Sequence, residues 1–344
     1  MDALKQVKAS FEAFTLDFKR PSGTSRGVLT QKKGWKLLLT DPEGITGLGE
    51  CSVIPGLSPD YVSDEHYEKK LTEVCRNPLL FIGNHALLRD YPSILFGLES
   101  AWFDLVNGGR RIYFNSANNP CGFTIPINGL IWMGDPGYMQ EQIEEKLAGG
   151  YSCIKLKVGA IDFRQELKLL EGIRSRYDAS KIVLRVDANG AFSMDDALHK
   201  LEELAQLELH SIEQPIKAGA WNDMERLCEQ TPLPIALDEE LIGINQTEEK
   251  IRLLETIRPQ YIILKPSLHG GFGGTREWID LAEQRQMPWW ITSALESNIG
   301  LNAIAQFTAD FHPVLPQGLG TGGLYETNFD APLKIEKGNL IYVV

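Results

Sequence analysis

The stretch CIKLKVG, residues 153–159, places two lysines two positions apart in a run that is otherwise apolar. A short apolar run that ends in glycine is typical of a buried strand. Side chains alternate across a strand, so Lys155 and Lys157 share one face while the aliphatic residues around them share the other. If the aliphatic face packs against helices, both lysines point into the interior of a closed sheet.

The same strand-like pattern recurs from about residue 121 onward, with helical patterns between the runs. The runs are FTIPINGLI, CIKLKV, KIVLRVDANG, LHSIEQP, LPIALDEE, QYIILKPS, MPWWITSAL and a weaker eighth candidate, VLPQGLGT. Amphipathic stretches lie between them, such as GYMQEQIEEKLAGG, DFRQELKLLEGIRSRYD, SMDDALHKLEELAQL and TEEKIRLLETIRP. This alternation predicts parallel βα units, and eight such units close a (β/α)8 barrel. A doubly wound open sheet is the alternative, but no GxGxxG turn follows the first strand.

The residues before the barrel pattern do not show the regular alternation of strand and helix. The alternating WKLLLT, the turn-rich TDPEGITGLGE and two helical patterns, DEHYEKKLTEVC and SILFGLESAWFDLV, predict a separate α+β domain over residues 1–120. The barrel is expected over 121–324. The tail 325–344 has strand and turn character, and we expect it to return to the first domain.

Composition limits the partners and the compartment. The 344 residues carry a net charge of −12, which would repel phosphate backbones and anionic membrane surfaces. The five cysteines are scattered and form no CxxC pair, which argues against a disulfide framework or a structural zinc site. No signal-peptide core and no run of about 18 apolar residues is present. We expect a cytoplasmic protein that binds a small molecule, neither nucleic acid nor membrane; oligomeric state does not follow from these features.

Charged residues end five successive strands with matching parity. They are Lys157, Asp187, Glu213, Asp238 and Lys265, separated by about 30, 26, 25 and 27 residues, each the length of one βα unit. The carboxyl ends of barrel strands form the mouth at which barrel enzymes place their catalytic groups. A single lysine or an isolated DANG turn is more often ordinary surface structure, but the joint recurrence predicts a functional ring.

The ring contains carboxylates that need positive charge. Two like charges about 4 Å apart repel by roughly 4 kcal/mol at an effective dielectric near 20, so converging carboxylates require protonation or a cation. Oxygen ligands without His or Cys favour Mg²⁺ or Mn²⁺ over Zn²⁺. A divalent cation also disfavours the ammonium form of a nearby lysine, which suits a general base. Metal and lysine together indicate proton abstraction next to a carboxylate, with the metal stabilising the enediolate.

As a set, the motifs KLK, VDANG, IEQP, LDEE and LKPS, followed by GG, resemble those of the enolase superfamily, specifically its muconate-lactonizing branch. The resemblance spans nearly the whole chain. It implies a modified (β/α)8 barrel with an N-terminal α+β capping domain completed by the C-terminal tail. It also implies Mg²⁺ or Mn²⁺ ligated by Asp187, Glu213 and Asp238, and catalysis by Lys157 and Lys265 on opposite faces of the substrate. The supporting residues near this centre would be Lys155, Asn189 and Glu239.

Within that branch, the loops indicate the reaction. The dipeptide epimerases carry an Asp-x-Asp where this chain reads LGTGGLY, which counts against them. The muconate cycloisomerases are not excluded by any single residue. TSRG, GLGECSVIPGLSP and SALESNIGL resemble segments of the o-succinylbenzoate synthases, which catalyse a dehydration in menaquinone biosynthesis.

The resemblance also implies which residues contact the substrate. They would be Ser25, Arg26, Leu57, Ser293, Glu296 and Ser297. Lys157 would take the proton and then assist departure of the hydroxyl from the same face, while a cationic Lys265 would stabilise the enediolate. An N-acylamino acid racemase or another epimerase or cycloisomerase of the subgroup is the alternative. A barrel that only binds a ligand is a third reading, disfavoured because burying so many charges costs stability.

Overall fold

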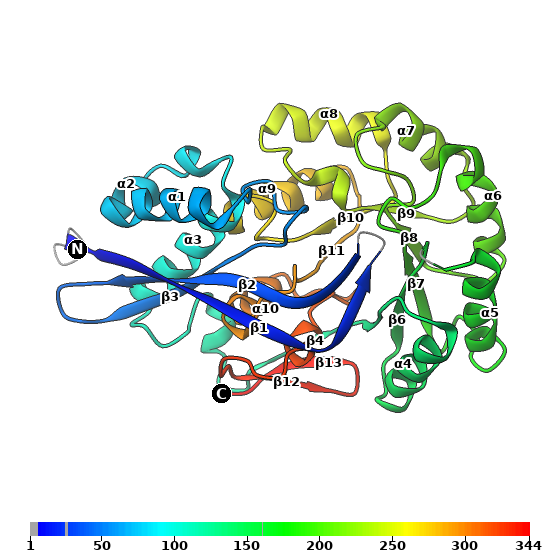
Figure 1. Ribbon diagram of the computed structural model, residues 1–344, viewed down its shortest axis with the longest axis horizontal. Coiled ribbons are helices and arrows are strands. Elements are labelled where there is room, and N and C mark those ends of the chain that lie inside the picture. Colours follow the sequence, from blue (N-terminus) through cyan, green and yellow to red (C-terminus); the bar gives the residue numbers. More distant parts are fainter. Residues whose placement is uncertain (1–5, 25–26, 160) are drawn as a thin grey trace.

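The computed structural model describes residues 6–24, 27–159 and 161–344. Its first part is a long antiparallel sheet, in the order β1 (Lys8–Thr24), β2 (Gly27–Thr40) and β3 (Thr46–Ser52). Helices α1 (Asp64–Arg76), α2 (Pro78–Ile82) and α3 (Pro92–Val106) follow, with the short helix η2 (His85–Leu88) before α3. Figure 1 shows these helices beside the sheet, at a distance from the curled sheet formed by the rest of the chain.

The second part is a curled parallel sheet with helices outside it (Figure 1). Its strands are β5 (Gly129–Ile131), β6 (Cys153–Lys157), β7 (Val183–Asp187), β8 (Ser211–Glu213), β9 (Ile235–Leu237), β10 (Tyr261–Leu264) and β11 (Trp289–Ile291). The connecting helices are α4 (Pro136–Ala148), α5 (Phe163–Arg174), α6 (Met194–Ala205), α7 (Trp221–Gln230), α8 (Thr247–Ile257), α9 (Gly271–Glu283) and α10 (Asn298–Ala309). Short helices η3 (Asn115–Asn118), η4 (Glu239–Leu241) and η5 (Thr321–Leu324) complete the helical elements of the described chain.

Two residues close the barrel at the predicted eighth position. Gln317 bridges Ile127 and Gly318 bridges Thr292, both in parallel, so this segment lies between the last and first strands of the sheet. Their backbone hydrogen bonds measure 2.8 Å from Gly318 N to the Ile291 carbonyl and 3.0 Å from Asn128 N to the Gln317 carbonyl. The prediction of a modified barrel is confirmed, with VLPQGLGT as its weakest strand.

The tail forms a hairpin, β12 (Leu333–Glu336) and β13 (Asn339–Tyr342), which pairs with β4 (Phe123–Pro126). The predicted run FTIPINGLI is therefore split between this small sheet and β5 of the barrel. Just before the hairpin, Tyr325 bridges Phe18 of β1. The tail thus contacts both parts of the chain, and the domain limits at 120 and 325 stay a prediction.

The aliphatic face of β6 meets the outer helices, as strand parity predicts. Ile154 and Leu156 are buried in one large cluster with Leu167 and Leu170 of α5. The first part of the chain has a hydrophobic core of its own, which includes Trp35. Because the outer face takes the aliphatic residues, the charged residues of the strands are left to the barrel interior.

Glu99 joins the two parts of the structure. It lies on α3, is 4% exposed, and accepts hydrogen bonds from the Phe272 and Gly273 amides at the start of α9, at 2.5 and 3.3 Å. The first backbone amides of a helix lack partners within the helix, and the carboxyl group of Glu99 accepts hydrogen bonds from two of them. Burial nevertheless raises the pKa of Glu99 to about 7.

We predict that this carboxyl makes the protein less stable as pH rises. Between pH 4.5 and about 7 the folded state retains a proton on Glu99 that the unfolded state has lost. The free energy of unfolding should therefore fall by about 3 kcal/mol across that window. Glu99→Gln should remove this pH-dependent loss of stability. The free energy of unfolding of the variant, relative to that of the parent protein, should therefore increase with pH. Urea unfolding of both proteins at pH 4.5, 6 and 8 measures this difference.

His85 Nδ1 lies 3.4 Å from the same carboxylate, so the comparison should be repeated in a His85→Ala background. Parallel stability curves for the parent protein and Glu99→Gln in both backgrounds would contradict the prediction.

Candidate active site

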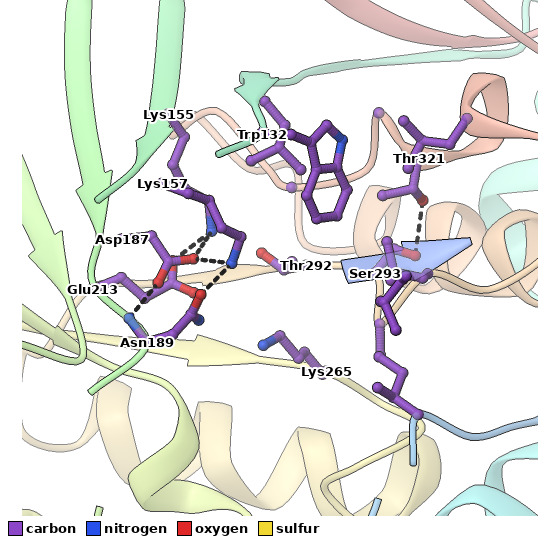
Figure 2. Close-up of a pocket in the computed structure, with 18 of the residues that line it drawn as sticks. Trp132, Lys155, Lys157, Asp187, Asn189, Glu213, Lys265, Thr292, Ser293 and Thr321 are labelled. Atoms are coloured by element: carbon purple, nitrogen blue, oxygen red, sulfur yellow. Dashed lines mark hydrogen bonds and ion pairs between the residues drawn. The ribbon is translucent and has the colours of Figure 1, made fainter. Parts of the chain in front are cut away.

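The five charged residues that end successive strands meet at one mouth of the barrel. Lys157 pairs in register with Asp187, and Asp187 with Glu213. Asp238 directly follows β9, and Lys265 directly follows β10. These side chains are between 0% and 8% exposed, although all five are ionisable. Figure 2 shows Lys157, Asp187, Glu213 and Lys265 around the same cavity.

The order of strands separates the two lysines. β6 carries Lys157 and β10 precedes Lys265, and between them the sheet runs β7, β8, β9. Those three strands supply Asp187, Glu213 and Asp238. A molecule held at the carboxylates therefore has an ammonium group on either side of it.

Asp187 is the most heavily contacted carboxylate. Lys155 Nζ lies 3.1 Å and Lys157 Nζ 2.8 Å from its Oδ2 atom, and Lys155 also donates to Glu213 Oε2 at 2.6 Å. The Asn189 amide donates to Asp187 Oδ1 at 3.0 Å. Asn189 holds a backbone φ of 45°, in the left-handed region that asparagine tolerates, and this turn brings its side-chain oxygen to 2.7 Å from Lys157 Nζ.

Lys265 is fixed from both ends. Its ammonium group donates to Asp238 Oδ2, and its backbone amide donates to His269 Nδ1 at 2.9 Å. Burial disfavours the ammonium form, but Asp238 and its neighbouring carboxylates outweigh burial and raise the pKa of Lys265 above its usual value. Burial likewise opposes ionisation of Asp238, yet Lys265 keeps the Asp238 pKa below its usual range. The neighbouring carboxylates therefore favour the ammonium form of Lys265.

Glu213 differs from its neighbours. Burial and the adjacent Asp187 charge raise the pKa of Glu213 well above its usual value. Burial also disfavours ionised Asp187, but Lys155 and Lys157 outweigh it and hold the Asp187 pKa below its usual range. Burial opposes the Lys155 ammonium as well, but Asp187 and Glu213 together raise the Lys155 pKa. Of these two carboxyls, Glu213 therefore has the greater tendency to hold a proton.

A further cation lies one layer below the ring. Arg185 pairs in register with Lys155 and is 1% exposed. Its guanidinium lies 4.0 Å over the Trp290 ring and donates to the Pro316 carbonyl at 2.7 Å. The cation–π contact and this hydrogen bond stabilise the buried guanidinium, which forms no ion pair with a carboxylate of the described residues.

The donor set fits a divalent metal. The carboxylates of Asp187, Glu213 and Asp238 come from adjacent strand ends, and Asp238 Oδ1 is buried with no hydrogen-bond partner among the described residues. Oxygen donors alone suit Mg²⁺ or Mn²⁺. Within the described ranges, no three His, Cys, Asp or Glu side chains already surround a common point. Lysine ammonium groups hold one oxygen of each carboxylate, so a metal would have to displace part of these ion pairs.

The ring opens into a cavity of about 210 Å³. Both parts of the chain line it: Leu29, Ile54, Pro55 and Leu57 come from the first part, and Leu130, Trp132, Thr292, Ser293, Leu295 and Thr321 from the second. Trp132, Ser293 and Thr321 face the same space in Figure 2. An apolar wall around a charged end suits a small carboxylate with an apolar body.

The predicted substrate contacts separate into three groups. Leu57 and Ser293 line the cavity. Glu296 and Ser297 are buried outside its lining, where Glu296 bonds Ser267 and Ser297 bonds Glu50. Ser25 and Arg26 lie outside the described residues. Of the predicted supporting residues, Asn189 donates to Glu239 Oε1 at 3.0 Å.

Sequence reasoning did not single out Trp132 or Thr321. Strand parity does point to Trp132: Leu130 pairs in register with Lys155, so Trp132 continues the inward-facing face that bears Lys157. Thr321 follows the short closing segment of the barrel, and no periodic pattern marks it.

Comparison with known proteins agrees with this architecture. The family model described as Enolase C-terminal domain-like matches residues 138–342. The chain belongs to the enolase superfamily. Within the superfamily, it is 47% identical to the o-succinylbenzoate synthase of Desulfotalea psychrophila, over 97% of this chain and 98% of that protein. The crystal structure of MenC from the same organism superposes with a TM-score of 0.85 at 44% identity, covering 97% of this chain and 99% of that one.

Superfamily members with other names are also similar. The N-succinylamino acid racemase of Thermus thermophilus is 31% identical, over 85% of this chain and 79% of that protein. In the structure itself, no helix of the described residues is long and apolar enough to cross a membrane.

We predict that Lys155→Met destabilises the fold. The variant keeps most of the side-chain volume but leaves Asp187 and Glu213 with one fewer buried cation. Removing one partner of a buried ion pair costs about 3–5 kcal/mol, to be measured by urea unfolding. The exposed Lys168 provides the control, since Lys168→Met should change stability by less than about 0.5 kcal/mol. Equal stability of the two variants would contradict the assigned pairing.

Proposed function

We propose that this protein is an o-succinylbenzoate synthase, which removes water from a cyclohexadiene carboxylate to form an aromatic ring. The geometry that supports the reaction class is the placement of Lys157 and Lys265 on either side of three carboxylates. The similarity to the Desulfotalea psychrophila enzyme supports the substrate. The dehydration would belong to menaquinone biosynthesis, in the cytoplasm.

Asp187, Glu213 and Asp238 would hold a Mg²⁺ ion, with Asn189 and Glu239 supporting the site. The ion supplies Lewis-acid stabilisation of the negative charge that develops on the substrate carboxylate. Positive charge at this position would favour the ionised form of Glu213, whose pKa burial and Asp187 raise.

Lys157 would act as the base and then as the acid. Its ammonium group is tied to Asp187 and Asn189, so it is held at a defined point of the mouth. In its neutral form it takes the proton next to the carboxylate; protonated, it gives that proton to the departing hydroxyl, so one side chain serves both steps on one face. Lys155 holds Asp187 from below and thereby positions Lys157.

Lys265 would act from the opposite side without exchanging a proton. The surrounding carboxylates favour its cationic form, and a fixed cation beside developing negative charge would stabilise the transition state without reorganisation. The cavity wall of leucine, isoleucine and tryptophan side chains would exclude water and hold the apolar body of the substrate.

We predict that the purified protein with Mg²⁺ converts the o-succinylbenzoate precursor to product, followed by absorbance. Lys157→Ala should lower kcat by about 10²–10⁴-fold, the range expected for the loss of a general base. EDTA should abolish turnover, and Mg²⁺ should restore it. Lys168→Ala, at an exposed position, should match the parent protein. No turnover by folded, Mg²⁺-binding protein would exclude the synthase while leaving metal-assisted proton abstraction open.

The second candidate is an N-succinylamino acid racemase, favoured by the Thermus thermophilus relative and by the lysine on each side of the site. A racemase exchanges the α-hydrogen of both enantiomers with deuterated solvent. We expect little such exchange if the protein is only a synthase, because Lys265 then remains charged.

A further inference from the structure

A second buried charged cluster lies beside the pocket and joins the two parts of the chain. We call it the bridge cluster. Its members are Lys32, Glu50, Ser267, Ser293, Glu296 and Ser297, which are between 0% and 4% exposed. Lys32 and Glu50 come from β2 and β3, whereas the other four follow β10 and β11. Only Ser293 of this cluster lines the cavity.

Glu50 caps a helix that belongs to the other part of the chain. Its carboxylate accepts hydrogen bonds from Ser297 N at 2.9 Å, Ser297 Oγ at 2.5 Å and Gly300 N at 2.8 Å. These groups lie at the start of α10, where backbone amides lack helical partners. A carboxylate is favoured there by the helix dipole, so the first sheet is locked to α10 at a defined position.

Glu296 ties together the loops that follow two neighbouring strands. It accepts from Ser293 Oγ at 2.5 Å and from Ser267 Oγ at 2.6 Å. Ser293 also receives a hydrogen bond from the pocket residue Thr321, at 2.8 Å. Ser267 lies two residues after Lys265. One buried carboxylate therefore holds a wall of the pocket and the loop that begins at Lys265.

Lys32 supplies the positive charge of the cluster. Its ammonium group donates to the Val53 carbonyl at 2.5 Å, directly before Ile54 of the pocket wall. Burial lowers the pKa of Lys32 to about 8, although attraction to Glu296 and Glu50 opposes that shift. The cation thus binds the pocket loop of the first part, while Glu296 and Glu50 attract it without a direct ion pair among the described residues.

We propose that Glu296 is a positioning residue for substrate binding, acting through Ser293, and that Lys32 and Glu50 align the first part of the chain with it. The inference rests on the proposed function. Buried ion clusters seldom add stability compared with apolar packing, but they specify one geometry because their partners must be matched. In this protein, the bridge cluster determines how the cavity wall at Ile54, from the first part of the chain, is oriented toward the cavity wall at Ser293, from the second part.

The first test is Glu296→Gln, which replaces an acceptor oxygen by an amide donor, so that one of the two serine hydroxyls loses its acceptor. KM for the o-succinylbenzoate precursor should rise about tenfold, as for the loss of a hydrogen bond to a charged group, while kcat changes by less than about twofold. Ser293→Ala should have a similar effect, and the double variant should add little, because both act through one contact. Ser100→Ala, at a buried serine bonded within α3, is the matched control and should leave KM unchanged.

The second test concerns charge balance and does not need turnover. Lys32→Met removes the buried cation that attracts both carboxylates, and adding Glu50→Gln removes one of the negative charges. Hydrogen exchange of the amides in residues 293–300 should accelerate in Lys32→Met and return toward the parent rate in Lys32→Met/Glu50→Gln. If the parent protein fails to turn over the precursor, the proposed function fails and the exchange rates alone decide this inference.

Two results would overturn the inference. One is a Glu296→Gln variant that melts at a lower temperature but keeps the parent KM, since a merely structural carboxylate would behave in that way. The other is unchanged exchange of residues 293–300 in Lys32→Met, or no recovery in the double variant.

Discussion

Three carboxylates end adjacent strands at the mouth of the barrel, and their mutual repulsion is the constraint on which the rest of the site depends. Each close pair costs roughly 4 kcal/mol at an effective dielectric near 20. The structure offsets this cost with Lys155 and Lys157 on one side and Lys265 on the other, and the pKa of Glu213 is raised. The same cations that make burial tolerable are the groups to which the proposed mechanism assigns proton transfer and charge stabilisation.

The ring could be predicted from sequence because parallel strands obey two simple rules. Side chains alternate along each strand, and the strands of a closed parallel sheet end at one mouth. The side-chain alternation at Lys157 and Asp187, together with the spacing of one βα unit, therefore predicted that residues distant in the sequence meet at one mouth of the barrel. The closing strand was the weakest prediction, since Gln317 and Gly318 form only isolated bridges and leave little pattern to detect.

Other features carried no comparable signal. α10 is buried on nearly all sides, from Ile299 to Ala309, because it lies between the two parts of the structure, and such a helix lacks an amphipathic period. The family resemblance implied that Glu296 and Ser297 contact the substrate, but neither lines the cavity, and strand parity does not fix the direction of side chains that follow a strand. The contact from Glu50 to Ser297 spans 247 residues, and no local pattern records it.

The shortness of the segment that closes the barrel has an evolutionary consequence. Gln317 and Gly318 contribute no member of the charged ring, yet Gly318, Gly320 and Thr321 line the cavity. Substitutions and insertions after this segment can reshape the bound molecule's surroundings without moving a lysine or a carboxylate. In the proposed mechanism, chemistry and selectivity are therefore carried by different stretches of chain, which would let descendants of one ancestor acquire new substrates while keeping the same charged ring.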